Sequence, residues 1–434
     1  MHGEFAQRLN WHLFSALDGL TRLGKPVAQP LAPGRPQPAI WLFISTIGEM
    51  NAIGGFLERL AALIPAEHWV ILSDRKIYRS AYLQRFPSAQ VVEISDDPRE
   101  AAALAAQRPP ALLLVAEIPL QPSDAPCRLP YAWAHSARRH GAALLLLNGW
   151  PYRYQPSCRA DLLERKLLGR AWLRAFDLVC IQDQAGADFV LAHGAKPASV
   201  HITGNMKFDA LAQSSAPPVE AENSLASWLQ ASGRPSIVAG SVTDAAEQEL
   251  VLAAFALLRQ QEANARLLLA PRHPENPAVM ANITQQCQQF SLSQQLRSAM
   301  LAGEADRAAA CLVLDTMGEL RTAFRFGAAS HIGRDHNLLE PLCAGLPVSA
   351  LPDWNSSYPS YPVFKLLAEG GDVALHDDAR GLADCWLAAL RAHSPAQQAA
   401  RTQSLYQRFG GATERSWQLA SPYLNQARAR LGLA

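Results

Sequence analysis

Carboxylate and amide side chains follow short apolar runs at three places in the first half of the sequence. Glu49, Glu117 and Asn148 each come directly after such a run or within a few residues of it. Partial removal of a carboxylate from water raises its pKa toward the range of a general base, so Glu49 is a candidate base. A glutamate in a first helical turn also stabilises that helix by up to about 1 kcal/mol, and position alone leaves both roles of Glu49 open.

Arg272 and His273 stand between two prolines in the string LLLAPRHPE. The prolines restrict the backbone, and a guanidinium after a strand can hold a phosphate through two parallel hydrogen bonds. A surface loop that happens to carry an arginine and a histidine explains the string equally well. We do not expect His273 to bind a metal ion, because neither an HxxxH pattern nor a ladder of carboxylates accompanies it, and no metal site is predicted.

Other polar groups stand where helices are predicted to begin. In GRDHNLLEP, Asn337 is a candidate helix cap and Glu340 lies one turn in, where N–H groups suit a phosphate and the carboxylate suits a ribose diol. In DTMGEL, Gly318 permits close approach of the backbone, and Glu319 is either a ligand or a helix-start charge. Ser241 follows a third strand candidate. Asn337 and Glu340 also fit an ordinary capping box, so the ligand hypothesis stays open here.

Short buried strands that alternate with helices must position these groups. Such alternation is typical of a parallel sheet with both faces covered by helices. Because ligands of open parallel sheets bind beyond the carboxyl ends of the strands, we expect the polar groups to lie at that edge. The predicted strands cover residues 40–44, 69–73, 90–94, 111–115, 142–147, 178–182, 236–239, 266–270, 311–314, 329–332 and 348–350.

The alternation of strands and helices stops once and then restarts. Residues 212–223 contain QSSAPPVEAEN, a polar, proline-containing stretch that predicts a linker. We therefore predict two doubly wound α/β domains, one over residues 1–211 that carries Glu49 and one over residues 224–434.

The composition excludes several classes of protein. Hydrophobic residues make up 49% of the 434 residues, which excludes wholesale disorder. The 39 basic and 38 acidic residues leave a net charge of +1, so we expect no nucleic-acid partner. Seven cysteines without a CxxC pair favour a reducing cytosol.

Residues 1–20 carry charges that exclude a signal peptide or a spanning helix. The spacing of their apolar residues fits either a packed helix or a peripheral membrane face.

Seven strings together resemble the bacterial 3-deoxy-D-manno-octulosonic acid (Kdo) transferases, glycosyltransferases of the GT-B fold that use CMP-Kdo to modify lipid A precursors. They stand in the order of the family, and GNMKFD and PRHPE are the most specific. No nucleophile elbow, Walker loop, GxGxxG or HExxH string competes with them. The strings are STIGEM (45–50), VAEIPL (115–120), ITGNMKFDAL (202–211), AGSVTDAAEQE (239–249), LLLAPRHPE (267–275), LDTMGEL (314–320) and HNLLEPLCAGLPV (336–348).

The resemblance implies two Rossmann-like domains that face each other across a cleft. The N-terminal domain would bind the acceptor, with Glu49 as the base that deprotonates its hydroxyl and Glu117, Asn148 and Lys207 beside the cleft. The C-terminal domain would bind the nucleotide sugar. Contacts to that donor are implied for Ser241, Arg272, His273, Met317, Gly318, Glu319, Asn337 and Glu340.

The implied reaction is the inverting transfer of Kdo or a related acid sugar from a CMP-activated donor to a glycan or lipid-linked acceptor. It would need no cofactor and no metal ion, the CMP-sugar being a substrate, and would belong to lipopolysaccharide or cell-envelope glycan biosynthesis. The expected location is the cytoplasm, with residues 1–20 as a candidate peripheral contact to the inner face of the membrane.

The departures from the family gather in the first half of the chain. The family's ETELWPN is VAEIPLQP here, which keeps Glu117, and its NARLSxRS is NGWPYRYQPS, which keeps Asn148. Arg334 and Asp335 replace a glycine-rich stretch, and the usual hydrophobic N-terminal anchor is absent. A changed acceptor is the natural inference. Two alternatives stay open: a GT-B enzyme with a UDP-sugar, as transferase or epimerase, and a non-catalytic GT-B partner of a glycan-synthesis complex.

Overall fold

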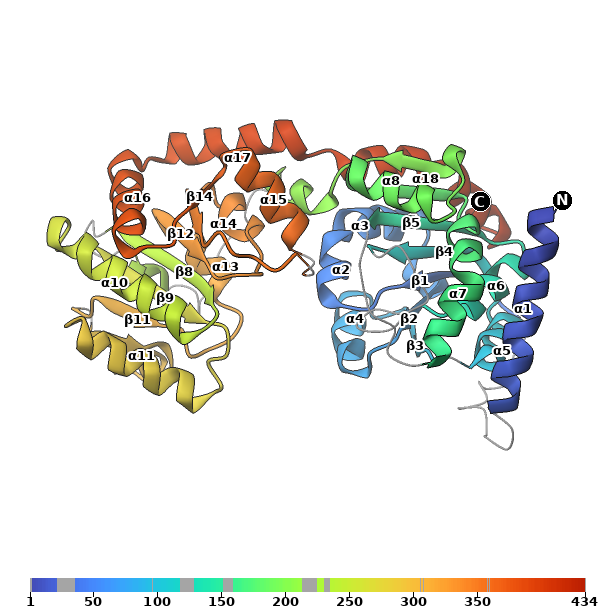
Figure 1. Ribbon diagram of the computed structural model, residues 1–434, viewed down its shortest axis with the longest axis horizontal. Helices are drawn as coiled ribbons and strands as arrows, with labels where there is room; N and C mark the ends of the chain where they lie inside the picture. Colours follow the sequence, from blue (N-terminus) through green and yellow to red (C-terminus); the bar gives the residue numbers. More distant parts are fainter. Residues whose placement is uncertain are drawn as a thin grey trace. The chain divides into compact units, whose positions relative to one another are not determined.

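The computed structural model describes residues 2–21, 36–95, 97–117, 129–150, 159–212, 225–229, 235–304, 306, 308–356, 358 and 360–433. The chain forms two compact units. Unit 1 contains Met1–Asp209 and Phe409–Ala434, and unit 2 contains Ala210–Arg408. The chain therefore leaves unit 1 once and returns to it for its last helix (Figure 1).

Unit 1 is built on a seven-stranded parallel sheet with the order β3-β2-β1-β4-β5-β6-β7. The strand order reverses direction beside β1, which is the doubly wound arrangement. Its long central strands are apolar and buried throughout, as parallel strands with two covered faces require. The strands are β1 (Ala39–Phe43), β2 (Trp69–Ser73), β3 (Gln90–Glu93), β4 (Pro110–Ala116), β5 (Ala143–Gly149), β6 (Leu178–Ile181) and β7 (Val200–Ile202).

Alternate residues of β1 enter two different cores, one on each face of this sheet. Trp41 packs with Phe14, Trp133 and Trp172, which come from the helices of one face. Leu42 packs in the other core. Figure 1 shows α1 with α5 and α6 on one side of the strands and α2 with α4 on the other. The helices are α1 (His2–Thr21), α2 (Ile47–Ala52), α3 (Gly54–Leu63), α4 (Arg79–Arg85), α5 (Pro98–Gln107), α6 (Tyr131–Arg139), α7 (Arg159–Arg174), α8 (Gln184–Ala192) and α18 (Ala412–Arg430).

Unit 2 repeats the plan with the order β10-β11-β9-β8-β12-β13-β14. Its strands are β8 (Ser236–Val242), β9 (Arg266–Pro271), β10 (Gln294–Leu296), β11 (Cys311–Val313), β12 (Ala329–Ile332), β13 (Val348–Ala350) and β14 (Val373–Leu375). Its helices are α10 (Ala245–Gln261), α11 (Pro277–Gln289), α12 (Arg297–Leu301), α13 (Leu320–Phe324), α14 (Leu339–Cys343), α15 (Tyr361–Glu369), α16 (Ala379–Ala392) and α17 (Pro395–Phe409).

The two doubly wound sheets confirm the predicted fold class, and every predicted strand is present to within a few residues. The sequence did not predict β7, β10 and β14, which lie at the edges of the two sheets. Their residues are only partly buried there, unlike those of the equally short inner strands β11 and β13, so a buried apolar run is not required. None of the described helices is long and apolar enough to span a membrane. That the two domains face each other across a cleft stays a prediction.

The expected C-terminal domain, residues 224–434, differs from unit 2 at its end. Helix α18 packs on the sheet of unit 1, where Ala420 and Leu424 are fully buried. Asp209 fixes the start of this helix, because its carboxylate accepts the N–H groups of Gly411 at 2.5 Å and Thr413 at 2.6 Å. The expected linker, 212–223, lies almost entirely outside the described residues.

Candidate functional site

Glu49 lies in the first turn of α2, directly beyond the carboxyl end of β1. Thr46 accepts the N–H of Glu49 at 3.2 Å, and Glu49 Oε2 accepts the N–H of Ser45 at 2.7 Å. This reciprocal arrangement is a form of helix capping that fixes the carboxylate in one place. Glu49 is 3% exposed. The helix-start role of Glu49 is therefore observed, and its role as a base stays a prediction.

A second carboxylate, which the sequence reasoning missed, lies near Glu49. Ser45 Oγ donates to Asp74 Oδ1 at 2.5 Å across the ends of β1 and β2. Burial raises the pKa of Tyr82, and the negative charges of Glu49 and Asp74 raise it further. Asp74 follows an apolar strand as Glu49 does, so the same sequence signal was available for it.

Glu117 and Asn148 occupy the carboxyl ends of the adjacent strands β4 and β5 with left-handed backbones. Their φ angles are 63° and 56°, which are strained for residues other than glycine. Both residues are buried, at 4% and 0% exposure. Asn148 Nδ2 is 3.4 Å from Glu117 Oε1, and Asn148 Oδ1 accepts the N–H of Met206 at 2.8 Å. The structure thus brings these two predicted residues together.

The GNMKFD string holds this polar cluster in place. Lys207 forms an ion pair with Glu117 Oε1, and Asn205 Oδ1 is 3.3 Å from Asn148 Nδ2. Gln182, at the end of β6, accepts a hydrogen bond from Asn205 Nδ2 at 2.9 Å. The specificity of the string has a physical basis, since its asparagine and lysine bind the strand ends and its aspartate caps α18.

In unit 2, Ser241 lies at an irregularity of β8 with a φ of 56°. The backbone of Gly333, from the end of β12, approaches it closely, because a Cβ on Gly333 would lie 2.0 Å from the carbonyl oxygen of Ser241. Only glycine fits there. Ser241 is therefore held in an unusual conformation at the strand-end edge where we expected it.

Arg272 and His273 point to different surroundings. The N–H of Arg272 donates to the carbonyl of Val242 at 3.0 Å, and its guanidinium lies 6.0 Å from the ring centre of Tyr358. His273 is exposed and its Nδ1 lies 3.0 Å from Glu275. Burial, with the positive charge of Arg272, lowers the pKa of His336 to about 4. Arg272 and His336 therefore share one environment, whereas His273 faces solvent.

The sequence reasoning did not single out Glu247, which organises the end of β8. This carboxylate is fully buried and accepts the backbone N–H of Thr243 at 2.8 Å and that of Arg334 at 3.3 Å. It also lies 3.6 Å from Nε2 of His331. Burial alone would raise the pKa of Glu247, but its contacts with His331 and Thr243 outweigh burial and lower it.

Glu319 forms an ion pair with a buried arginine. Arg297, which is fully buried, donates from Nη2 to Glu319 Oε1 at 2.6 Å, and Thr316 Oγ1 donates to Oε2 at 2.5 Å. Although burial would raise the pKa of Glu319, these two contacts lower it. In the loop between Thr316 and Glu319, Met317 is 80% exposed and Gly318 has a φ of 91°. Arg297 thus anchors the loop that presents Met317.

The N-cap of α14 is Leu338, which makes no side-chain cap hydrogen bond, so Asn337 stands one residue before the cap and does not form the expected capping box with Glu340. The N–H of Leu339 donates to Asn337 Oδ1 at 3.1 Å, and Asn337 Nδ2 is 3.4 Å from Glu340 Oε1. Burial raises the pKa of Glu340, opposed by the charge of Arg321 and by Asn337. Asn337 therefore orders the turn before α14 through its contact with Leu339, and ligand contacts of both residues stay predictions. No group of three or more potential metal ligands occurs among the described residues.

Solved structures with both α/β domains are similar to most of the chain. A glycosyltransferase from Rickettsia africae matches with a TM-score of 0.56 and 11% identity, over 89% of this chain and 99% of that one. Anabaena HepE in complex with UDP gives 0.55 and 14%, over 88% and 99%. The UDP-GlcNAc 2-epimerase of Methanocaldococcus jannaschii gives 0.54 and 9%, over 85% and 99%. These similarities place the chain in the GT-B class of two-domain α/β folds.

Sequence relatives identify a narrower group. Residues 125–210 match the family described as 3-deoxy-D-manno-octulosonic-acid transferase (kdotransferase). The enzyme of that name from Chlamydia trachomatis serovar A is 25% identical over 74% of this chain and 72% of its own length. The one from Aquifex aeolicus is 27% identical over 42% and 46%. These matches bear out the distant similarity to Kdo transferases that the motifs indicated.

Proposed function

We propose that this protein is an inverting glycosyltransferase that moves Kdo or a related acid sugar from a CMP-activated donor to an acceptor hydroxyl. One observation carries the proposal. The described residues include five non-glycine residues at positive φ, and four of them, Glu117, Asn148, Ser241 and Asp335, lie at or just beyond the carboxyl ends of strands. Such conformations each cost about 1–3 kcal/mol and cluster at ligand sites. That edge is also where open parallel sheets bind ligands.

Unit 2 would hold the donor. Arg272 supplies a guanidinium for the phosphate, and the neutral ring of His336 beside it can donate a hydrogen bond without a second positive charge. Glu340 would accept hydrogen bonds from the ribose diol. Because Glu319 is paired with Arg297, its proposed part is to hold the loop that carries Met317 against the donor. Ser241, Gly318, Asn337 and His273 complete the proposed donor contacts.

Unit 1 would activate the acceptor. Glu49 is the proposed base, held by its backbone contact with Ser45. The acceptor hydroxyl would lose its proton to this carboxylate as its oxygen bonds to the sugar and the bond between the sugar and the phosphate of CMP breaks, so that CMP leaves. Glu117, Asn148 and Lys207 would bind polar groups of a glycan or lipid-linked acceptor. No cofactor or metal ion enters this scheme, in which the CMP-sugar is a substrate.

We further propose that α1 rests on an anionic lipid surface at the cytoplasmic side of the membrane. Its exposed side carries Leu9, Leu13, Leu17 and Leu20 at 58%, 48%, 41% and 65% exposure. Helix α7 packs beside it, since Asn10 donates to the carbonyl of Leu167 at 3.0 Å. Over residues 162–174, the part of α7 whose side chains the structure describes, the exposed residues are apolar or basic: Leu162, Lys166, Arg170 and Arg174. Leucines beside cations suit anionic headgroups, whereas a second copy would bring like charges together.

Thermal unfolding with nucleotides tests the donor. We expect CMP to raise the unfolding temperature of the full chain, and UDP and GDP to leave it nearly unchanged. A ligand at 100 times its dissociation constant stabilises by about 2.7 kcal/mol, which such a measurement resolves easily. Arg272→Gln should abolish the shift. A response to UDP alone would favour the UDP-sugar alternative, and no response to any nucleotide would favour the non-catalytic one.

A further inference from the structure

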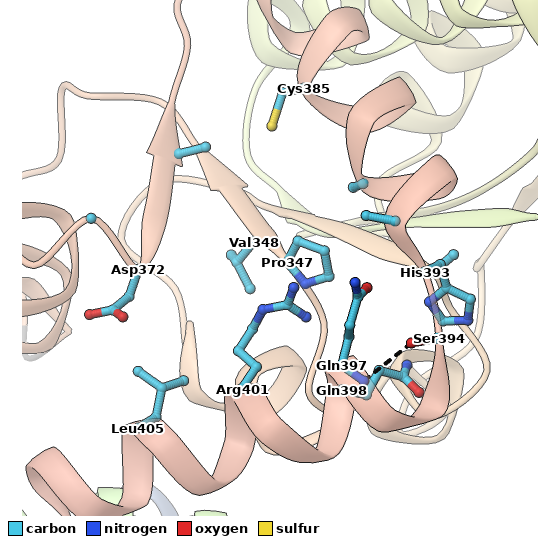
Figure 2. A pocket seen from close by; sticks show the side chains of 15 residues that line it. Pro347, Val348, Asp372, Cys385, His393, Ser394, Gln397, Gln398, Arg401 and Leu405 are labelled. Atoms are coloured by element: carbon cyan, nitrogen blue, oxygen red, sulfur yellow. Dashed lines mark hydrogen bonds between the residues drawn. The ribbon is translucent and has the colours of Figure 1, made fainter.

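A cavity of about 330 Å³ opens at the amino edge of the unit 2 sheet. Residues just before β12, β13 and β14 line it, together with the end of α16 and the first turns of α17. It is therefore at the edge opposite to the strand ends that carry the candidate donor site. In Figure 2, Arg401 extends from α17 toward Pro347 and Val348, with His393 and Ser394 on one side of it and Asp372 on the other.

Arg401 is a half-buried cation in this cavity. Its Nη1 donates to the carbonyl oxygen of Gly345 at 2.5 Å, and no carboxylate of the described part of the chain pairs with its guanidinium. Asp372 also lines the cavity: its Oδ1 accepts a hydrogen bond from Arg408 at 2.7 Å, and its buried Oδ2 has no hydrogen-bond partner among the described residues. In Figure 2 it lies on the side of Arg401 away from His393 and Ser394. Burial lowers the pKa of Arg401, and burial together with Arg401 lowers that of His393. A half-buried cation that is paired with no carboxylate is costly, and an anion would offset that cost.

The walls of the cavity are fixed. A Cβ on Gly345 would lie 2.5 Å from the carbonyl oxygen of Gln398, so α17 is seated closely on the turn before β13. Pro347, Val348 and Leu405 add apolar surface beside Arg401. Through its contact with Gly345, Arg401 could serve only to stabilise the carboxyl end of α14, where a cation is favourable. That contact, however, uses one of the five N–H groups of the guanidinium.

We propose that this cavity is a second ligand site, which binds a small organic anion with its carboxylate or phosphate on Arg401 and a short apolar body against Val348 and Leu405. The volume lies at the lower end of the range of small-molecule sites. A guanidinium is the side chain best suited to bind either oxyanion through two hydrogen bonds. The ligand would contact α17, the last helix before the chain returns to unit 1.

Isothermal titration of the full chain with benzoate, phenyl phosphate and inorganic phosphate tests the site. We expect saturable binding of benzoate or phenyl phosphate, and the stronger of the two identifies the oxyanion. Inorganic phosphate, which lacks an apolar body, should bind at least tenfold more weakly. Arg401→Gln should weaken the organic anion at least tenfold, while Arg391→Gln, an exposed arginine on α16, should leave it unchanged. No saturation below about 10 mM for any probe would overturn the proposal.

Two further measurements separate this site from the others. Saturating CMP should not change the affinity for the organic anion, and competition between them would overturn the proposal by placing the anion in the donor site. If Arg401→Gln does not fold, Ala389→Leu narrows the cavity from α16 without touching Arg401. Unchanged binding in that variant would also overturn the proposal. Loss of CMP binding by Arg272→Gln with intact anion binding would show that the two sites are independent.

Discussion

The ammonium of Lys207 is paired with the carboxylate of Glu117, a residue whose backbone has a φ of 63°. Glu117 ends β4, and Lys207 belongs to the GNMKFD segment that follows the last strand of unit 1. The ion pair therefore ties a strained strand end to the segment from which the chain leaves this unit. Because the side chain of Glu117 is only 5% exposed, loss of Lys207 would leave a buried carboxylate without its cation.

Lys207→Met should lower the free energy of unfolding of unit 1 by about 3 kcal/mol, because it leaves a buried carboxylate without its cation. Glu117→Gln in the same chain should restore part of the loss. Urea unfolding followed by tryptophan fluorescence measures both. Equal stability of the single and the double variant would mean that the unpaired carboxylate of Glu117 is not the cause of the loss.

Glu49→Gln and Glu49→Ala separate the two roles of Glu49. Glutamine still accepts the N–H of Ser45, so the proposed base function predicts a loss of turnover of about 10² to 10⁴ with little change in stability. Alanine also removes the cap and should cost a further 0.5–2 kcal/mol, approximately. Turnover with CMP-Kdo and thermal unfolding are the two readouts. Full activity of Glu49→Gln would leave Glu49 as a capping residue only.

His135 makes the stability of unit 1 depend on pH. Burial lowers its pKa to about 4, and the charges of Arg139 and His12 lower it further. In the unfolded chain His135 becomes protonated near pH 6.5, whereas in the folded chain it becomes protonated only near pH 4. Stability should fall as the pH falls through this window, by at most about 1.4 kcal/mol per pH unit.

His135→Phe keeps a ring against Trp11, whose centre lies 4.3 Å from that of His135, and removes the titration. The advantage of the variant over the natural chain should grow as the pH falls from 6.5 to 4. Urea unfolding at several pH values measures this difference. Parallel curves for the two proteins would contradict the assignment.

Gly333→Ala should destabilise unit 2 by at least about 2 kcal/mol, because its Cβ would overlap the backbone of Ser241. The same change should weaken CMP binding, since it displaces a proposed donor contact. Gly169→Ala is the matched control, a helical glycine with no atom within 4 Å of an added Cβ, and it should be neutral or stabilising. Similar behaviour of both variants would remove the steric argument.

Co-sedimentation with vesicles tests the proposed lipid contact. The chain should bind vesicles that contain anionic lipid and should release them at high salt. Leu13→Glu with Leu17→Glu should abolish binding, whereas Ile77→Glu, at an equally apolar residue that is 73% exposed elsewhere on unit 1, should not. If the variant with both glutamates still binds the vesicles, a surface other than α1 makes the lipid contact.

Candidate site residues could be predicted from the sequence where a polar residue directly follows an apolar run. Glu117, Asn148 and Ser241 follow apolar runs, and parallel sheets bring the carboxyl ends of their strands to one edge. Asp74 carried the same type of signal but stood in a string that matched no expectation. Glu247 stood in a matching string, but it lies in the first turn of α10, and only its contacts with Thr243, Arg334 and His331 show its role. The partners of Glu319 could not be predicted, because Arg297 lies in a short helix whose position only the packing of unit 2 defines.

The sequence by itself determined the two doubly wound sheets, because buried parallel strands need continuous apolar runs and leave them visible in the chain. It did not determine that α18 belongs to the first unit, since an apolar helix face fits many sheets and says nothing about which one it covers. Only the tertiary structure decided that, along with the left-handed backbones of Glu117 and Asn148 and the ion pair with Lys207. These depend on contacts between residues far apart in the chain, and local sequence does not encode such contacts.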